Sequence, residues 1–145
     1  MVGVAEIRNR SVTFRAAIER CSEQLRSRAL DQFPRGSCGD VSDMLGEFLQ
    51  RTSGIECDYV VGCTAEGSHA WLEYGGVFID ITADQFPGNA PVIVSRDSVF
   101  HRQFSVQSRR PASLNRPAGK ESQDLKRYYQ LLVNDIQIHD TESRQ

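Results

Sequence analysis

The chain has 145 residues, a length typical of one globular domain. Hydrophobic residues make up 39% and charged residues 25%, which fits a folded core and excludes an intrinsically disordered chain. With 17 Lys and Arg against 19 Asp and Glu, the net charge of −2 excludes a domain-wide basic surface for nucleic acid. We therefore expect no nucleic-acid partner.

The start of the chain, its apolar segments and its cysteines predict the cellular compartment of the protein. Residues 1–8 lack the apolar run of a signal peptide, and no segment approaches the roughly 20 apolar residues of a membrane span. We expect a cytoplasmic protein with no membrane partner. No two cysteines form a C-x-x-C pair, so free thiols are expected rather than disulfides or a structural zinc site; the cysteines are Cys21, Cys38, Cys57 and Cys63.

Two helices are predicted in the first third of the chain. From about Ala5 to Leu30, apolar side chains recur at three- and four-residue steps, which is the period of a helix. Pro34 and Gly36 interrupt the pattern. A second helix is predicted from near Cys38 to about Gln50, ended by the Thr-Ser-Gly sequence at 52–54.

The pattern then changes to that of strands. Alternating or short apolar segments predict strands over residues 57–63, 68–74, 77–82 and 91–95. The pair Gly75-Gly76 predicts a hairpin turn, and the proline that opens the fourth segment places that strand at an edge of the sheet. Residues 96–120 are expected to be mostly irregular, residues 121–136 helical, and the tail 139–145 frayed.

The order of helices, antiparallel strands and a closing helix indicates an α+β fold. We expect a single domain over residues 1–145. It would comprise a helical part at 1–31, a core that carries the chemistry at 32–95, an irregular segment with the last helix at 96–138, and the tail.

Cys38 is the first candidate for chemistry. It follows Gly36-Ser37 at the start of a predicted helix, where unpaired backbone N–H groups and the helix dipole favour a thiolate. The same N–H groups, with that of Gly39 beside the cysteine, would stabilise an oxyanion on an attacked carbonyl. The alternative is a buried free cysteine that only packs. Asp40 nearby opposes thiolate formation.

A cysteine nucleophile needs a base, and the base needs an acceptor that orients it. If the hairpin turns at Gly75-Gly76, Trp71 opposes Asp80, and His69 lies diagonal to Asp80 on the same face. The spacing therefore suits a His–Asp pair. Each residue also has a structural interpretation, as a core histidine or an aspartate that ends a strand.

Segments 68–74 (SHAWLEY) and 78–82 (FIDIT) resemble the HAW-x-E … D-x-T block of transglutaminase-like proteins. The resemblance covers roughly residues 32 to 86. It implies a papain-like fold, in which a helix carrying the Cys packs on an antiparallel sheet carrying His and Asp. It also implies Cys38 as nucleophile, His69 as general base and then acid, and Asp80 as the group that orients the imidazole. Small leader peptidases of lasso-peptide maturation are similar in size and in this residue order.

Three further residues complete the predicted site. Residues 32–38 (QFPRGSC) resemble the papain motif, in which a glutamine six residues before the cysteine donates its amide to the oxyanion; this implies that role for Gln32. Gly39 departs from that motif, which has an aromatic after the cysteine. Trp71 would shield the triad, line a substrate channel or pack in the core.

Two other segments have open interpretations. The sequence Asp84-Gln85-Phe86 would form the rim of a site or an exit turn capped by its aspartate. His101, flanked by Phe100 and Phe104, is expected to be a packed or surface histidine, and the alternative is a spare functional histidine.

The sequence thus favours a cysteine-dependent hydrolase or acyl-transferase that acts on an amide or peptide bond of a protein or peptide substrate. A peptidase or amidase is the first choice, and a deamidase or transglutaminase is the second. No metal or organic cofactor is expected. The competing interpretation is a catalytically silent domain of the same fold that binds a protein or peptide. A Cys–His metal site would need a further ligand such as Cys57 or Cys63.

Overall fold

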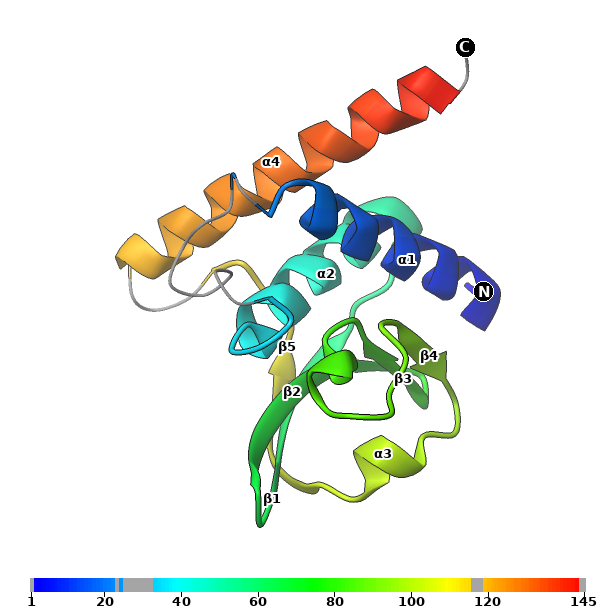
Figure 1. Cartoon of the computed structure of the whole chain (residues 1–145), viewed down its shortest axis with the longest axis vertical. Helices are drawn as coiled ribbons and strands as arrows, with labels where there is room; N and C mark the ends of the chain where they lie inside the picture. The colour runs from blue at the N-terminus through cyan, green and yellow to red at the C-terminus, as the bar shows by residue number, and fades with distance from the viewer. Residues whose placement is uncertain (1, 23, 25–32, 116–118, 144–145) are drawn as a thin grey trace.

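The elements stack in three layers, which Figure 1 shows in one view. The computed structural model describes residues 2–22, 24, 33–115 and 119–143. A long helix, α4 (Gly119–Ser143), crosses two helices, α1 (Val4–Arg20) and α2 (Cys38–Ser53), and these pack against a five-stranded sheet. The arrangement is α+β, as the sequence predicts.

The sheet is antiparallel throughout, with the strand order β4-β3-β2-β1-β5. Its strands are β1 (Asp58–Thr64), β2 (Gly67–Tyr74), β3 (Val77–Asp80), β4 (Ile93–Ser95) and β5 (Ser105–Pro111). A 3-10 turn, η1 (Ala83–Gln85), follows β3, and a one-turn helix, α3 (Val99–Arg102), connects β4 to β5. β4 lies at a sheet edge, as predicted, but it begins at Ile93, two residues after the Pro91 on which that prediction is based.

The hairpin between β2 and β3 fixes the register on which the site depends. Gly75 and Gly76 have φ angles of 53° and 80°, a region that glycine enters without the cost of a Cβ clash. Tyr74 therefore pairs with Val77, and the pairing continues along the two strands. This confirms the predicted register, which carries Trp71 opposite Asp80.

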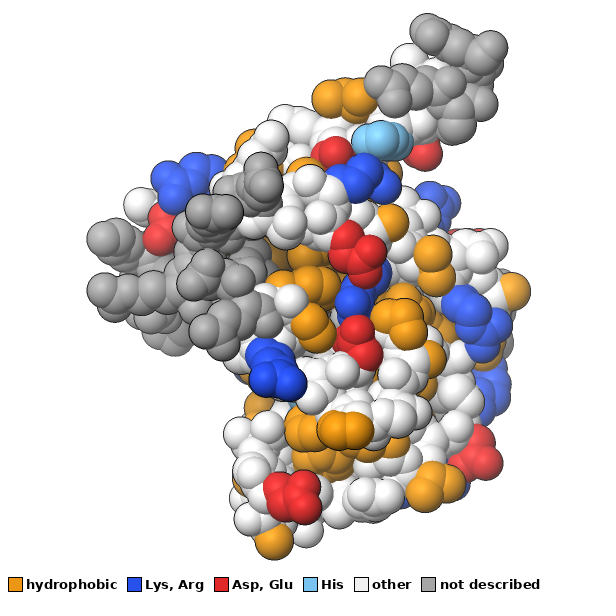
Figure 2. All heavy atoms as spheres, in the orientation of Figure 1, with side chains coloured by type: hydrophobic (Ala, Val, Ile, Leu, Met, Phe, Trp, Pro, Cys, Tyr) orange, Lys and Arg blue, Asp and Glu red, His pale blue; other side chains and the backbone are white. Residues whose placement is uncertain are grey.

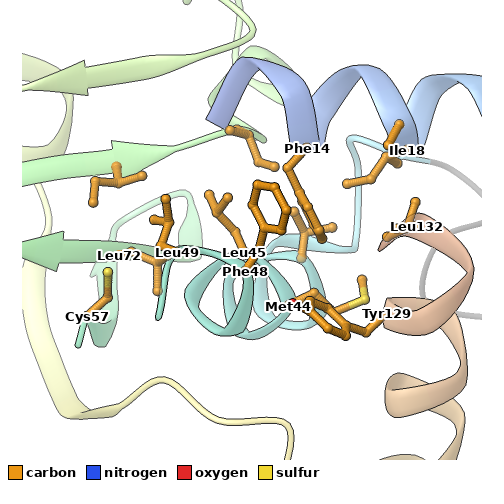
Figure 3. Close-up of a cluster of buried hydrophobic side chains, with 14 of the residues drawn as sticks. Phe14, Ile18, Met44, Leu45, Phe48, Leu49, Cys57, Leu72, Tyr129 and Leu132 are labelled. Carbon is orange, nitrogen blue, oxygen red and sulfur yellow. The ribbon is translucent and has the colours of Figure 1, made fainter. Parts of the chain in front are cut away.

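Helix α2 lies at the centre of the main core. It ends at Gly54, whose φ of 69° is left-handed and whose N–H bonds the carbonyl of Gln50. Its apolar stripe is buried against the sheet on one side and against α1 and α4 on the other; the stripe comprises Val41, Met44, Leu45, Phe48 and Leu49. Figure 3 shows Phe14 of α1 meeting this stripe, with ring centroids 5.1 Å from Phe48 and 6.3 Å from Tyr129 of α4.

The opposite face of the sheet carries a smaller, aromatic core. Side chains alternate between the two faces of a strand, so Leu72 joins the main core and Trp71 the smaller one. Val60 and Phe104 complete the smaller core. Gly62 makes it possible, because a Cβ there would lie 2.7 Å from both the Trp71 ring and Phe104.

The prediction that residues 96–120 are mostly irregular is wrong, because β5 pairs with β1 along most of its length. Every β5 residue is exposed and most are polar, so the strand has no apolar pattern to read. Distant contacts hold it instead. Arg110 donates to both oxygens of buried Asp43 in α2, at 3.0 and 2.8 Å, and its guanidinium lies 3.9 Å from the centre of the Tyr59 ring.

Three element ends also differ from the prediction. α1 ends at Arg20, and Cys21 and Ser22, both weak helix formers, form a turn; residues 25–32 lie outside the described residues. β3 ends at Asp80, whose carboxylate captures a backbone N–H two residues on. α4 continues to Ser143, so the tail is not frayed up to that residue. Residues 137–141 of this helix are exposed, so they need no core.

Candidate active site

Cys38 is the first residue of α2, as the sequence predicts. The preceding residue, Ser37, makes no side-chain cap hydrogen bond, so no cap competes for the N–H groups of the first turn. These N–H groups and the helix dipole favour negative charge on the half-buried thiol. Asp40, also in the first turn, opposes that effect.

His69 and Asp80 form a buried hydrogen-bonded pair on neighbouring strands. His69 Nε2 lies 2.7 Å from Asp80 Oδ2, and the two residues are 1% and 2% exposed. The other carboxylate oxygen accepts from the backbone N–H of Thr82 at 2.9 Å and from its hydroxyl at 3.3 Å. Because Asp80 is held at both oxygens, it fixes the orientation of the imidazole ring. The predicted His–Asp pair is therefore present.

The thiol of Cys38 completes the series. His69 and the backbone N–H of Ala70 both lie close enough to its sulfur to stabilise a thiolate. Since Nε2 of His69 is bound to Asp80, Nδ1 is the ring nitrogen available to the sulfur. Cysteine, histidine and aspartate thus lie in sequence. The four cysteines are free thiols, as expected.

The charge of His69 stabilises both of its neighbours, while the charge of Asp80 opposes the thiolate of Cys38. Burial alone raises the pKa of the Cys38 thiol, but the hydrogen bonds and charge of His69, with Ala70 N–H, lower it below its ordinary value. Burial lowers the pKa of His69, yet Asp80 and Cys38 outweigh it and raise that pKa to about 9. Despite complete burial, hydrogen bonds from two histidines hold the pKa of Asp80 well below its usual range. The pair therefore favours thiolate and imidazolium.

The second of those histidines is His101, which sequence reasoning did not place in the site. Its Nε2 lies 2.7 Å from the same Oδ2 of Asp80 that His69 uses. The Ser98 hydroxyl is 2.6 Å from its Nδ1, so a proton donated by Ser98 fixes the tautomer that carries hydrogen on Nε2. The residue is 2% exposed and follows Phe100 on α3. No spacing in the sequence relates it to Asp80.

Gln85 is the other residue that the structure adds. Its side-chain amide Nε2 lies 3.2 Å from His69 Nδ1, the nitrogen that also meets Cys38. The sequence suggested a rim at residues 84–86, but it gave Gln85 no role. Gln85 is half-buried at the end of η1, directly after β3.

Aromatic rings surround the histidine pair. Phe86 meets His69 edge-on with ring centroids 5.1 Å apart, and Phe100 lies 5.9 Å away. Both are only partly buried, and the face in Figure 2 shows hydrophobic side chains exposed over the loop that follows β3. Trp71, 1% exposed, packs 5.0 Å from His101 and donates its indole N–H to Glu73 at 2.9 Å. It is a wall of the site on the buried side.

The two remaining predicted residues have different outcomes. Gly39 follows Cys38 in the first turn of α2, and a Cβ there would lie 2.8 Å from the Tyr59 hydroxyl. A side chain at this position, such as the aromatic of the papain motif, would displace Tyr59. Gln32 lies outside the described residues.

Among the described residues, one group has the composition of a metal-ligand set: His69, Asp80 and His101, whose ligand atoms lie within 4.8 Å of one another. Both imidazole Nε2 atoms, however, approach a single carboxylate oxygen at 2.7 Å, which is a hydrogen-bond distance. Protons on the two nitrogens account for the geometry. Neither Cys57 nor Cys63 belongs to this group.

Two surface hollows lie away from the triad. One, of about 500 Å³, is lined by Asn134, Gln137, Ile138 and Thr141 of α4. The other, of about 370 Å³, lies between α2 and α4 and is lined in part by Glu47 and Arg51. The chemistry of Cys38 and His69 gives the stronger argument for a site, because neither hollow is lined by a cysteine or a histidine.

In the described ranges, no helix is long and apolar enough to cross a membrane. Comparisons with protein-family models, with curated proteins and with solved structures found no match.

Proposed function

We propose that this protein is a cysteine-dependent hydrolase that cleaves an amide or peptide bond through Cys38, His69 and Asp80. The observation that carries the proposal is the position of His69, which meets the Cys38 sulfur on one side and Asp80 Oδ2 at 2.7 Å on the other. A nucleophile, a base and an orienting acceptor are what covalent acyl transfer requires.

The reaction has two stages. The Cys38 thiolate attacks the carbonyl carbon, the C–N bond breaks, and the imidazolium of His69 gives its proton to the leaving amine. The product of this stage is a thioester on Cys38. Neutral His69 then takes a proton from water, the resulting hydroxide attacks the thioester, and the C–S bond breaks to release a carboxylic acid. If an amine replaces water, the same site is a transferase.

We also propose that the fold is papain-like and of the transglutaminase-like type. The support is the chain order of cysteine, histidine and aspartate, with the cysteine at the start of a helix that packs on β2. The HAW-x-E and D-x-T motifs fall on β2 and at the end of β3, which is where His69 and Asp80 are needed.

A protein or peptide is the substrate class that we favour. The partly exposed rings of Phe86 and Phe100 beside His69 offer apolar contact to a side chain near the scissile bond. Peptidase or amidase chemistry, with water as the acyl acceptor, is our first choice over cross-linking. This chemistry needs no metal or organic cofactor.

A screen of peptide and amide libraries tests the proposal. Turnover is read by mass spectrometry with the wild-type protein and with Cys38→Ala and His69→Ala. We expect cleavage by the wild type, together with a hydroxylamine-labile adduct on Cys38, and neither in the two variants. Cys63→Ala is the matched control, since Cys63 is also a half-buried free thiol but is not bound to His69. If Cys38→Ala keeps full function in binding a partner, the protein is a silent binding domain instead.

A further inference from the structure

The amide of Gln85 lies at Nδ1 of His69, the ring nitrogen that Asp80 does not occupy. Gln85 Nε2 is 3.2 Å from Nδ1, while Nε2 of the ring is 2.7 Å from Asp80 Oδ2. The thiol of Cys38 interacts with the same ring. This arrangement brings the amide to the side of the ring that remains for the sulfur, where a carbonyl under attack would place its oxygen.

We propose that the side-chain amide of Gln85 donates a hydrogen bond to the oxyanion that forms when Cys38 attacks a carbonyl group. This rests on the proposed acyl-transfer function and assigns it a further catalytic residue. Negative charge develops on the carbonyl oxygen in that step, and preorganised N–H donors aimed at it supply much of the rate enhancement. The N–H groups at the start of α2 are backbone donors, and Gln85 adds a side-chain donor.

The protonation of His69 controls when that donor is available. A neutral imidazole bound to Asp80 through Nε2–H has a lone pair on Nδ1, which accepts an N–H from Gln85. When Nδ1 carries a proton, that lone pair is gone, and the amide can no longer donate to the ring. The amide N–H is thus released from the ring when His69 is protonated and its positive charge balances an anion at Cys38.

The segment that carries Gln85 is held in place by α1. Arg15, 9% exposed, donates to both oxygens of Asp84 at 2.7 and 2.8 Å and to the carbonyl of Ile81 at 2.9 Å. Asn89 donates to the carbonyl of Ala83 at 3.1 Å.

These bonds fix the backbone of η1 just before Gln85. The amide is therefore carried by a rigid turn beside His69, and a donor held on a rigid element accelerates a reaction more than a mobile one.

The rival explanation is that Gln85 only orients His69. Two reactions of Cys38 distinguish this role from that of an oxyanion donor. Alkylation by iodoacetamide needs the thiolate and its imidazolium, but it creates no oxyanion. Acylation by p-nitrophenyl acetate also needs the thiolate and its imidazolium, and in addition it passes through a tetrahedral oxyanion. We compare the wild type with Gln85→Met, which has a similar shape and no N–H donor, and with Gln85→Glu, which retains an acceptor for protonated His69.

We expect both variants to lose about 100-fold to 1,000-fold in the rate of acylation by p-nitrophenyl acetate, which is the effect of removing one oxyanion donor. The rate at which iodoacetamide alkylates Cys38 should be the same in Gln85→Met as in the wild type. The alkylation rate also reports that the site is folded in the same sample. Gln107→Met is the matched control, because Gln107 is exposed on β5 and, within the described part of the chain, its side chain bonds the Ser105 carbonyl two residues away. Its acylation rate should equal that of the wild type.

The proposal is overturned if Gln85→Met loses alkylation and acylation together, since Gln85 would then act through His69. It is equally overturned if neither rate falls. If the wild-type protein alkylates rapidly at Cys38 but releases no p-nitrophenol, acyl transfer itself fails and this proposal fails with it. If Cys38 is unreactive toward both reagents, the triad is not activated, and the proposed function is wrong at its first step.

Discussion

Replacing Asp80 by asparagine removes one charge from the centre of the site and keeps its shape. In the wild type, Oδ2 accepts from two imidazole N–H groups and Oδ1 from Thr82. An amide has one acceptor oxygen and one donor NH₂ group, so it cannot satisfy both sides. Either the histidines or Thr82 must face an N–H. A buried donor left without an acceptor costs about 1–3 kcal/mol.

Removing the charge of Asp80 also lowers the pKa of His69, and this effect is larger than the cost of the unpaired donor. Its pKa is raised to about 9, and hydrogen bonding and charge from Asp80 are the foremost causes that raise it against burial. The difference from an ordinary histidine near 6.5 corresponds to about 3 kcal/mol in favour of the charged ring. In Asp80→Asn only Cys38 opposes burial, so we expect the pKa of His69 to fall to 6.5 or below.

Titration of the imidazole resonances by NMR measures this directly, with His69→Gln used to assign the signal. Asp97→Asn is the matched control, because the side chain of Asp97 is 76% exposed on the surface. It should leave the pKa of His69 near 9. The reasoning would be refuted if that pKa also stayed near 9 in Asp80→Asn, since Asp80 would then not be the group that charges His69.

Two other substitutions test the surroundings of the pair. His101→Phe retains the aromatic packing but removes one donor from Asp80, so we expect a loss of about 2 kcal/mol in the free energy of unfolding, measured by urea denaturation; an unchanged stability would mean that this hydrogen bond is not made. Gly62→Ala places a methyl group 2.7 Å from Trp71 and Phe104, and should cost about 1–3 kcal/mol by the same measurement. A variant as stable as the wild type would contradict the close packing.

The pH dependence of stability follows from the same pair. The raised pKa of His69 contributes stability below pH 6.5 and loses it as pH rises through about 9. The lowered pKa of Cys38 contributes stability above the ordinary thiol value, about 8.5, and loses it as pH falls through the folded value. Above about pH 8.5 only the loss at His69 remains, so the contribution of the pair falls as pH rises through about 9. The difference in unfolding free energy between wild type and Cys38→Ala should fall over the same range, and a difference independent of pH would contradict the ion pair.

The sequence predicts the parts of this site that depend on local pattern. The start of α2 at Cys38 follows from Pro34 and Gly36, and the hairpin at Gly75-Gly76 sets the register that brings His69 to Asp80. These are short-range effects of glycine and of alternating side chains, and both are visible in one sequence.

What the sequence does not reveal depends on contacts between distant segments. His101 reaches Asp80 from a one-turn helix that has no apolar period of its own. Gln85 gains its position from Arg15, 69 residues before its neighbour Asp84. β5 has no buried residue to mark it as a strand, and its pairing with β1 comes from the backbone. Such features need the fold to be known first.

The most direct test of the account is the pH dependence of alkylation at each cysteine, read by peptide mass spectrometry. Cys38, with its lowered pKa, should react with iodoacetamide rapidly below pH 7, while buried Cys57, whose pKa is raised to about 12, should not. In His69→Ala the reaction of Cys38 should move to the pH range of an ordinary thiol, near 8.5. If Cys38 reacts like an ordinary thiol in both proteins, the imidazole does not activate it, and the site is not that of a cysteine enzyme.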